Sequence, residues 1–189
     1  MHFHLTKRQA ARIIAGCPAC QQSSLATSPF AADGVNPRGL YSNDLWQTDT
    51  TIFPPFGCFK YIIASVDPHS RFLFASAHTK NSAKQVIRHW LAIFAFVGSP
   101  TCIKTDNGPE FSVQILRQFC ANWNIIHKTG IPYNSTGQAI IERCHRTLKA
   151  ALQKTKGGNE YYKNDPQGIL NHALFTLNFL NLAEDGDVD

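Results

Sequence analysis

The first pattern along the chain, between residues 45 and 78, is a series of mostly apolar segments separated by short stretches that form turns. The segments 45–53 and 58–66 are rich in β-branched and aromatic residues, which predicts two strands. Residues 67–70 carry proline at the second position of a predicted turn. The segment 71–78 then predicts a third strand, antiparallel to the second.

After residue 82 the apolar spacing lengthens to three or four residues, which predicts a helix. Ser82 followed by Gln85 is typical of a capping box, and the glycine and proline within residues 98–100 end the helix. The apolar positions at helical spacing are Val86, Trp90, Ile93 and Val97. We expect this helix to be the crossover to the next strand.

The middle of the chain repeats the alternation of strand and helix. Residues 101–105 predict a short strand that ends at Asp106, and residues 125–128 predict a fifth strand. Between them we expect a helix capped by Ser112. Its predicted buried stripe consists of Leu116, Phe119, Cys120 and Trp123.

Two further helices are predicted after an exposed, mobile loop over residues 130–137, which mixes glycine, proline, asparagine and serine. The last helix-like segment covers residues 169–182. The helix directly after the loop is expected to face the core with Ile141, Cys144, Leu148 and Leu152.

The charge is uneven along the 189 residues. The net charge is +5, but four acids lie within residues 184–189, so residues 1–183 hold 18 basic and 9 acidic side chains, a net charge of +9. A basic body favours a polyanionic partner such as nucleic acid. The alternative is the ordinary basic surface of a soluble enzyme.

Hydropathy predicts a soluble protein without a membrane partner. The longest wholly apolar run is residues 91–97, far short of the ~20 residues that a spanning helix needs. The first twenty residues do not resemble a secretory signal. The six cysteines are therefore expected to be thiols of a reducing compartment, and those at 58, 102, 120 and 144 to be small buried hydrophobes.

Three carboxylates, Asp49, Asp106 and Glu142, are the candidate chemistry. Asp106 and Glu142 are separated by 35 residues, and all three acids lie in mostly apolar or small surroundings where an isolated charge is costly to bury. Carboxylate oxygens are suitable ligands for Mg²⁺ or Mn²⁺. Two such ions about 4 Å apart stabilise both the attacking and the leaving oxygen of a phosphoryl transfer. The alternative is ordinary turn and cap chemistry.

The segments around these acids resemble the catalytic core of retroviral integrases of the alpharetroviral and betaretroviral branches. The resemblance to the betaretroviral branch is the stronger of the two. The matching segments are Gly34-Val35-Asn36-Pro37-Arg38-Gly39-Leu40, Trp46-Gln47-Thr48-Asp49, Ile103-Lys104-Thr105-Asp106-Asn107-Gly108, Thr129-Gly130-Ile131-Pro132-Tyr133-Asn134 and Gly137-Gln138-Ala139-Ile140-Ile141-Glu142-Arg143. The resemblance implies a ribonuclease-H-like α/β fold, with a five-stranded mixed sheet flanked by helices.

The resemblance also implies the reaction and its partners. Asp49, Asp106 and Glu142 are the expected catalytic ligands of two Mg²⁺ or Mn²⁺ ions. The expected chemistry is 3′ processing of viral DNA ends followed by strand transfer into host DNA, without a covalent enzyme intermediate. The expected assembly is a homodimer or higher homo-oligomer with a host chromatin tether, found in the virion and then in the host cytoplasm and nucleus.

A predicted DNA-binding face surrounds Glu142. Gln138, Glu142, Arg146 and Lys149 follow one another at three- and four-residue steps and share one side of a helix. A solvated face with internal ion pairs is the alternative. The resemblance adds Tyr133 and Asn134 as loop contacts to DNA, although Thr136 and Pro68 depart from the family pattern.

The first part of the chain is expected to hold half of a zinc site. Cys17 and Cys20 form a Cys-x-x-Cys pair, and zinc requires four ligands. The family supplies two histidines further upstream than the sixteen residues available here, so zinc is expected only in the full-length protein; His2 and His4 are the alternative ligands. The expected divisions are a zinc-domain remnant (1–24), a linker (25–40), the catalytic core (41–183) and an acidic start of the next linker (184–189).

Two other classes of protein share these features. A transposase or a ribonuclease H uses the same fold and metals, and a truncated, inactive copy would serve as a dimerising DNA-binding module. The integrase-like segments in the linker and in the loop argue against a transposase or a ribonuclease H. The three intact acids argue against an inactive copy. The isolated fragment is expected to be limited to disintegration-type activity.

Overall fold

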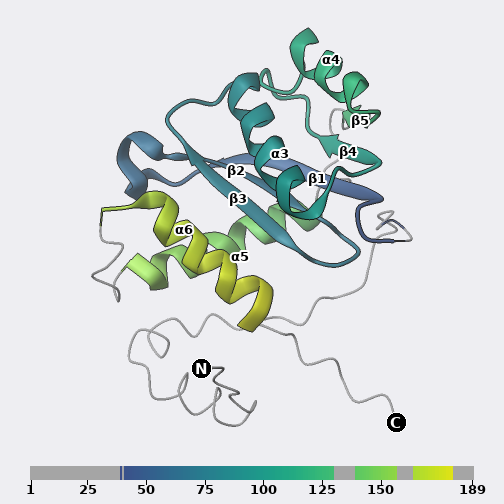
Figure 1. The fold of residues 1–189 in the computed structure, drawn as a ribbon. Helices are drawn as coiled ribbons and strands as arrows, with labels where there is room; N and C mark the ends of the chain where they lie inside the picture. Colours follow the sequence, from purple (N-terminus) through teal and green to yellow (C-terminus); the bar gives the residue numbers. More distant parts are fainter. Residues whose placement is uncertain (1–38, 40, 130–138, 157–163, 181–189) are drawn as a thin grey trace, which may run out of the picture.

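The computed structural model describes residue 39 and residues 41–129, 139–156 and 164–180, which form one sheet covered by helices (Figure 1). The elements are β1 (Leu45–Ile52), η1 (Pro54–Phe59), β2 (Tyr61–Val66), β3 (Leu73–His78), α3 (Ala83–Val97), β4 (Cys102–Thr105), α4 (Gln114–Asn122), β5 (Ile126–Thr129), α5 (Ala139–Lys156), α6 (Pro166–Phe175) and η4 (Thr176–Leu180).

The sheet has five strands in the order β3-β2-β1-β4-β5. β2 pairs antiparallel with both β1 and β3, whereas β4 pairs parallel with β1 and β5. The helix α3 makes the crossover from β3 to β4 that parallel pairing requires. The predicted α/β class, with a mixed five-stranded sheet flanked by helices, is confirmed.

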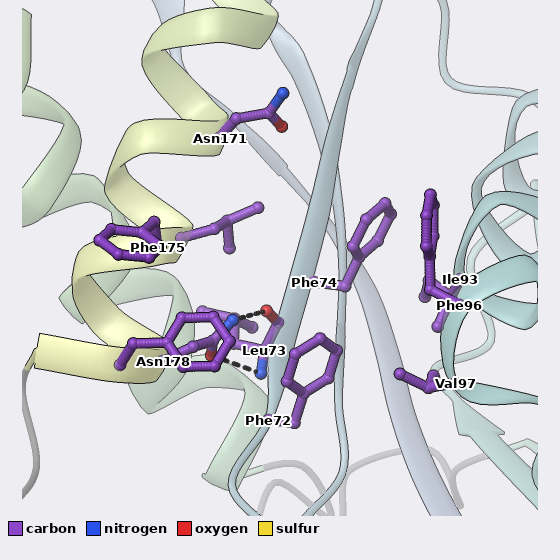
Figure 2. A pocket seen from close by; sticks show the side chains of 11 residues that line it. Phe72, Leu73, Phe74, Ile93, Phe96, Val97, Asn171, Phe175 and Asn178 are labelled. Carbon is purple, nitrogen blue, oxygen red and sulfur yellow. Dashed lines mark hydrogen bonds between the residues drawn. The ribbon is translucent and has the colours of Figure 1, made fainter. Parts of the chain in front are cut away.

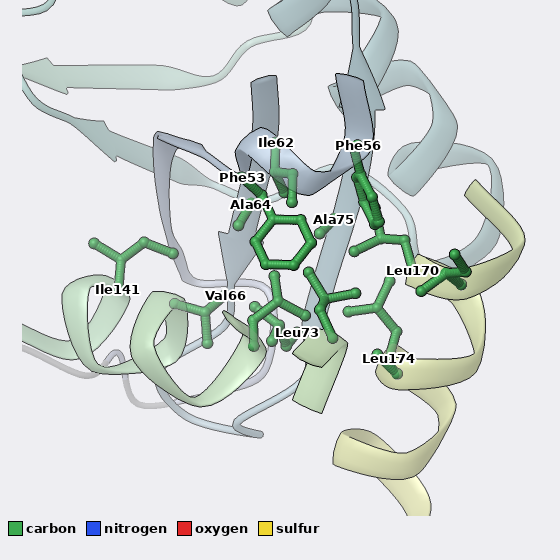
Figure 3. Packing of buried hydrophobic residues seen from close by; sticks show 14 residues of the cluster. Phe53, Phe56, Ile62, Ala64, Val66, Leu73, Ala75, Ile141, Leu170 and Leu174 are labelled. Carbon is green, nitrogen blue, oxygen red and sulfur yellow. The ribbon is translucent and has the colours of Figure 1, made fainter. Parts of the chain in front are cut away.

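Each face of the sheet has its own core. On one face, α5 packs over β1 and β2 and α6 packs over the edge strand β3, with Ile62, Ala64 and Val66 of β2 in the core (Figure 3). On the other face, α3 and α4 cover Ile63 together with Trp46 of β1. Because successive strand residues point to opposite faces and both faces are covered, the apolar run in β2 is continuous rather than alternating.

The start of β2 corrects the sequence prediction. Residues 54–59 form a 3₁₀ helix instead of the beginning of a strand, and Cys58 is exposed rather than buried. Two prolines begin this segment, and Gly57 has a φ of 59°, which glycine adopts without strain. The other predicted core cysteines in the described residues, Cys102 and Cys120, are buried, and Cys144 is half-buried.

The helix caps also differ from prediction. Ser82 precedes α3, but its side chain makes no cap hydrogen bond, and the Gln85 oxygen binds His78 instead. Ser112 does not cap α4, since its hydroxyl donates to the carbonyls of residues 107 and 108 and the helix begins at Gln114. Trp123, expected in the buried stripe of α4, is 42% exposed.

The last helix begins earlier than predicted and ends in a different geometry. Asp165 accepts a hydrogen bond from Gln167 N at 3.1 Å and caps α6, with Pro166 in the first turn. The π-helical turn η4 then continues to Leu180. Among the described residues, none of the helices is both long and apolar enough to span a bilayer.

Candidate active site

Asp49 lies within β1, and Asp106 directly follows the neighbouring parallel strand β4. In the register of β1 and β4, Gln47 pairs with Lys104, so continuing it by two residues sets Asp106 opposite Asp49. Carboxyl ends of parallel strands meet at one edge, where the ligands of α/β sheets gather. Two acids that are 57 sequence positions apart are thus neighbours because the crossover helix α3 returns the chain to β1.

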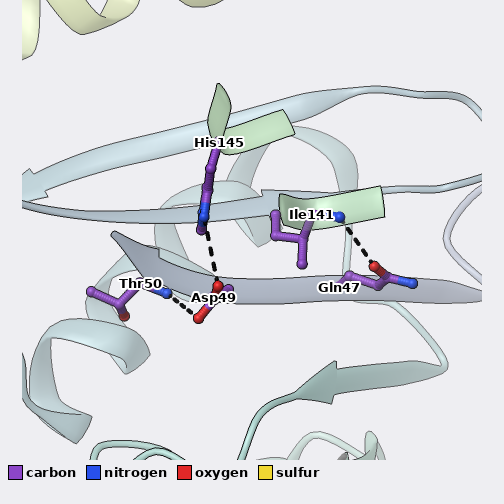
Figure 4. Close-up of polar contacts among 5 residues, drawn as sticks. All are labelled: Gln47, Asp49, Thr50, Ile141 and His145. Carbon is purple, nitrogen blue, oxygen red and sulfur yellow. Dashed lines mark hydrogen bonds and ion pairs between the residues drawn. The ribbon is translucent and has the colours of Figure 1, made fainter. Parts of the chain in front are cut away.

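Glu142 comes to this edge on α5. The buried residues Ile141, Leu148 and Leu152 hold α5 against the sheet, and Glu142 follows Ile141 on the exposed side. The helix is also tied to β1, because Ile141 N donates to the side-chain oxygen of Gln47 at 3.3 Å. The first turn of α5 therefore lies over the strand that carries Asp49 (Figure 4).

The electrostatics of Asp49 reflect this crowding. Its side chain is 19% exposed, and its pKa is raised from 3.8 to about 6. Burial is the largest cause; the hydrogen bond from Thr50 N, at 2.7 Å, lowers the pKa, and repulsion from Asp106, Glu110 and Glu142 raises it. The region around Asp49 therefore concentrates negative charge, and bound cations would relieve that repulsion.

The three acids differ in burial, and only Asp49 is half-buried. Asp106 and Glu142 are exposed, so their charges carry little desolvation cost. In the part of the chain that the structure describes, no three Asp, Glu, His or Cys side chains converge closely enough to ligate one ion. The donor chemistry fits a hard divalent cation, and joint ligation by the triad stays a prediction.

Sequence reasoning missed Glu110, a fourth carboxylate. Its oxygen accepts a hydrogen bond from the Asn81 amide at 2.6 Å. A Cβ on Gly108 would lie 2.8 Å from the Glu110 carboxylate and 2.9 Å from that of Asp106, so any larger residue at position 108 would displace these carboxylates. The only sequence signal was its position four residues after Asp106.

Sequence reasoning also missed His145, which lies one turn after Glu142 on α5. Its Nδ1 is 3.6 Å from Asp49 Oδ2 (Figure 4). Burial, followed by the nearby Lys149 cation, lowers the pKa of His145 to about 4, so the imidazole is neutral at physiological pH. A histidine three positions after a candidate ligand on a helix was the available signal.

The predicted DNA-binding residues are only partly described. Arg146 is exposed and Lys149 is half-buried on α5, the helix that carries Glu142. Gln138, the loop residues Tyr133 and Asn134, the mobile loop as a whole and the zinc pair Cys17 and Cys20 lie outside the described residues.

Comparison with known proteins gives consistent relatives. Residues 41–135 match the family model described as "Integrase core domain". The Gag-Pro-Pol polyprotein of Sheep pulmonary adenomatosis virus is 45% identical over 187 residues, which is 99% of this chain and 11% of the polyprotein. That of Mason-Pfizer monkey virus is 46% identical over 183 residues, 96% of this chain and 10% of the polyprotein. The chain thus spans about a tenth of these polyproteins.

Solved structures of similar fold are integrases. A simian T-cell lymphotropic virus intasome in complex with PP2A regulatory subunit B56 gamma has a TM-score of 0.69 at 30% identity, covering 96% of this chain and 64% of that one. The HTLV-2 integrase catalytic core domain in complex with magnesium, in a trimeric form, has a TM-score of 0.62 at 29% identity, covering 78% and 93%. A dimeric form gives the same TM-score and identity, covering 78% and 94%.

Proposed function

The chain belongs to the retroviral integrase core family, with betaretroviral relatives, and from this premise we propose that it carries the polynucleotidyl transferase site of an integrase. The proposed reactions are 3′ processing of viral DNA ends and strand transfer into host DNA. The proposed catalytic residues are Asp49, Asp106 and Glu142.

The observation that carries this proposal is the register of β1 and β4, which brings Asp106 opposite Asp49 beneath the helix of Glu142. The raised pKa of Asp49 supports it, because an ionised, half-buried carboxylate beside three other acids is unfavourable in the metal-free protein, and bound cations would relieve this cost without protonation of the group. We assign Asp49 and Asp106 to one Mg²⁺ or Mn²⁺ ion, and Asp49 and Glu142 to the other. When bound, two such ions neutralise the attacking and leaving oxygens of an in-line displacement.

The remaining work of the chain is positioning. The strands β1 and β4 and the helix α5 hold the three carboxylates from separate elements, so a phosphodiester is oriented without a side-chain nucleophile. Arg146 and Lys149 on α5 are proposed to neutralise DNA phosphates beside the site, as a basic stripe does in nucleic-acid binding. Tyr133, Asn134 and Gln138 are proposed as further contacts to the DNA end.

Wider roles follow from the relatives as proposals. Viral DNA ends and host DNA are the proposed substrates, with a host chromatin tether as partner. The proposed locations are the virion and then the cytoplasm and nucleus of the host cell. Cys17 and Cys20 are proposed as two ligands of a zinc site.

We also propose that a second copy of the chain covers an apolar groove between α3 and α6 (Figure 2). The groove has a volume of about 270 Å³ and crosses the edge strand β3. Phe96 of α3 is 84% exposed and Phe175 of α6 is 54% exposed beside it. Large exposed aromatic side chains on one face favour a protein partner, and the solved dimeric and trimeric relatives support self-association.

The function is tested with a preassembled branched DNA and Mn²⁺. The chemistry needs only the acids, the ions and a positioned phosphodiester, so the 189-residue chain is expected to resolve this substrate. Glu142→Gln keeps the side-chain shape but removes a charge, and is expected to lower the rate at least about 100-fold.

The matched control is Asp165→Asn, the same chemical change at the cap of α6, where asparagine caps as well as aspartate. It is expected to keep full activity. Both variants are expected to unfold within about 0.5 kcal/mol of the parent. If Glu142→Gln resolves the branched DNA at the rate of the parent, the proposed triad is refuted. If the parent is inactive, the alternative of an inactive DNA-binding module is favoured.

A further inference from the structure

We infer that His145 is a positioning residue which, together with Gln47, fixes α5 against β1 and so sets the Glu142 carboxylate relative to Asp49. The inference rests on the proposed function, because it assigns to His145 a role in preparing the proposed metal site. It arises from two contacts between β1 and α5 on either side of Glu142 (Figure 4).

The two contacts match the periodicities of their elements. Gln47 and Asp49 are two positions apart on β1 and point to the same face, while Ile141 and His145 are four apart on α5 and also share a face. Gln47 Oε1 accepts from Ile141 N at 3.3 Å, and His145 Nδ1 lies 3.6 Å from Asp49 Oδ2. Strand and helix therefore meet at two points, and Glu142 lies between them in sequence.

The Gln47 contact fixes the beginning of the helix. Ile141 is the third residue of α5, so its backbone N–H has no partner within the helix. A buried side chain of the neighbouring strand supplies that partner. A shift of α5 by one residue would move the helix by about 1.5 Å and rotate Glu142 by about 100°, and it would break this hydrogen bond.

The His145 contact fixes the orientation of the Asp49 carboxylate. Oδ1 accepts from Thr50 N at 2.7 Å, while Oδ2 faces His145. One oxygen is therefore held by β1 and the other faces α5. The 3.6 Å separation is longer than a hydrogen bond, so the interaction is an electrostatic contact between the imidazole and the carboxylate.

Packing alone does not account for a histidine at this position. His145 is 8% exposed, and its Nε2 has no hydrogen-bond partner among the described residues. A buried polar atom without a partner costs free energy that an aliphatic side chain would not, and the other core positions of α5 are aliphatic. The contact with Asp49 is the interaction that offsets this cost.

The inference predicts an effect on metal affinity rather than on folding. Outer residues that orient metal ligands typically contribute 10- to 100-fold to affinity. His145→Leu fills the space without the polar contact, so Mn²⁺ binding to the 189-residue chain, measured by electron paramagnetic resonance, is expected to weaken by about 10-fold or more. The melting temperature in EDTA is expected to be unchanged or higher.

Two variants and one control complete the experiment. His145→Asn retains a donor on a shorter side chain and is expected to recover part of the affinity. Gln47→Leu removes the other contact and is expected to weaken Mn²⁺ binding in the same direction, which keeps the inference testable even if His145→Leu does not fold. The control His69→Leu changes an exposed turn histidine and is expected to bind Mn²⁺ like the parent.

A readout of catalysis separates positioning from chemistry. With branched DNA, His145→Leu is expected to need a higher Mn²⁺ concentration for half-maximal rate, while the rate at saturating Mn²⁺ stays near that of the parent. Parent-like Mn²⁺ binding by His145→Leu, or by Gln47→Leu where His145→Leu is unfolded, would overturn the inference and leave the proposed function intact. A parent that binds no Mn²⁺ would overturn the proposed metal site itself.

Discussion

At the scale of single residues, Asp49 illustrates a conflict between stability and the proposed function. Its pKa is raised to about 6, mainly by burial, so the ionised form is less stable in the folded chain than in the unfolded chain. The folded protein therefore gains stability when Asp49 is protonated. This gain is complete below pH 3.8 and is lost as the pH rises through about 6.

Asp49→Asn is accordingly expected to stabilise the metal-free chain at neutral pH. A shift of about two pKa units corresponds to at most about 3 kcal/mol, and we expect roughly 1–2 kcal/mol because asparagine is polar too. Urea unfolding in EDTA measures this, and the advantage of the variant over the parent should shrink from pH 7.5 to pH 4.5. Mg²⁺ should stabilise the parent only. A variant less stable than the parent at pH 7.5 would contradict this account.

At the scale of elements, a buried chain of hydrogen bonds joins β1, β2, β3 and α3. Its successive members are Trp90, Thr48, Ser65, His89, Ser76, His78 and Gln85. Burial lowers the pKa of both imidazoles, so both are neutral at pH 7. The side-chain oxygen of Gln85 can only accept, so His78 donates from Nδ1, and with neutral imidazoles each bond back to the indole N–H of Trp90 then has one direction.

This chain of bonds predicts sensitivity to acid. Burial, followed by the neighbouring His78, lowers the pKa of His89 from 6.5 to about 3. Below pH 6.5 the unfolded chain binds a proton at His89 that the folded chain does not, so stability is lost as the pH falls from 6.5 towards 3. The expected loss is about 1.4 kcal/mol per pH unit, or roughly 2 kcal/mol at pH 5.

His89→Gln tests this expectation. The variant is expected to be about 1–3 kcal/mol less stable at pH 7, since a buried bond is disturbed, but to lose less stability between pH 7 and pH 5 than the parent. Urea unfolding at both pH values measures the difference, with His69→Gln at an exposed turn position as the control. Equal losses in the parent and His89→Gln would show that His89 is not the group responsible.

At the scale of the whole molecule, the groove between α3 and α6 is the proposed contact with a second copy. Asn178 of η4 bonds both backbone polar groups of Leu73, at 3.0 and 2.8 Å, so the edge strand β3 is covered there. Association is therefore expected through exposed aromatic side chains of the helices rather than through added strand pairing.

Phe96→Lys is expected to weaken self-association because it sets a charge at the exposed side of this groove. Sedimentation should detect at least a 10-fold higher dissociation constant, since loss of a buried aromatic anchor typically costs about 2 kcal/mol or more. Ile115→Lys, a comparable change at an exposed position of α4, should leave association unchanged. A strictly monomeric parent at high concentration would refute the proposed dimer.

The sequence alone determined the family, the order of strands and helices in the described residues, and the three candidate acids. These features depend on short stretches of sequence. The strand and helix periodicities repeat over a few residues, and each acid lies in a short segment that resembles the family, such as Lys104-Thr105-Asp106-Asn107-Gly108. Burial within each element was less predictable. Trp123 and Cys58 are exposed because the surrounding elements, and not their own hydrophobicity, decide what is covered.

Which distant groups meet depends on the folded structure and not on any local stretch of sequence. The contact between His145 and Asp49 joins residues 96 positions apart, and the chain of bonds through His89 needs three strands and a helix in register. The raised pKa of Asp49 and the lowered pKa of His89 follow from burial on opposite faces of one sheet. Desolvation and repulsion depend on distances in the folded chain, and no local pattern in the sequence contains those distances.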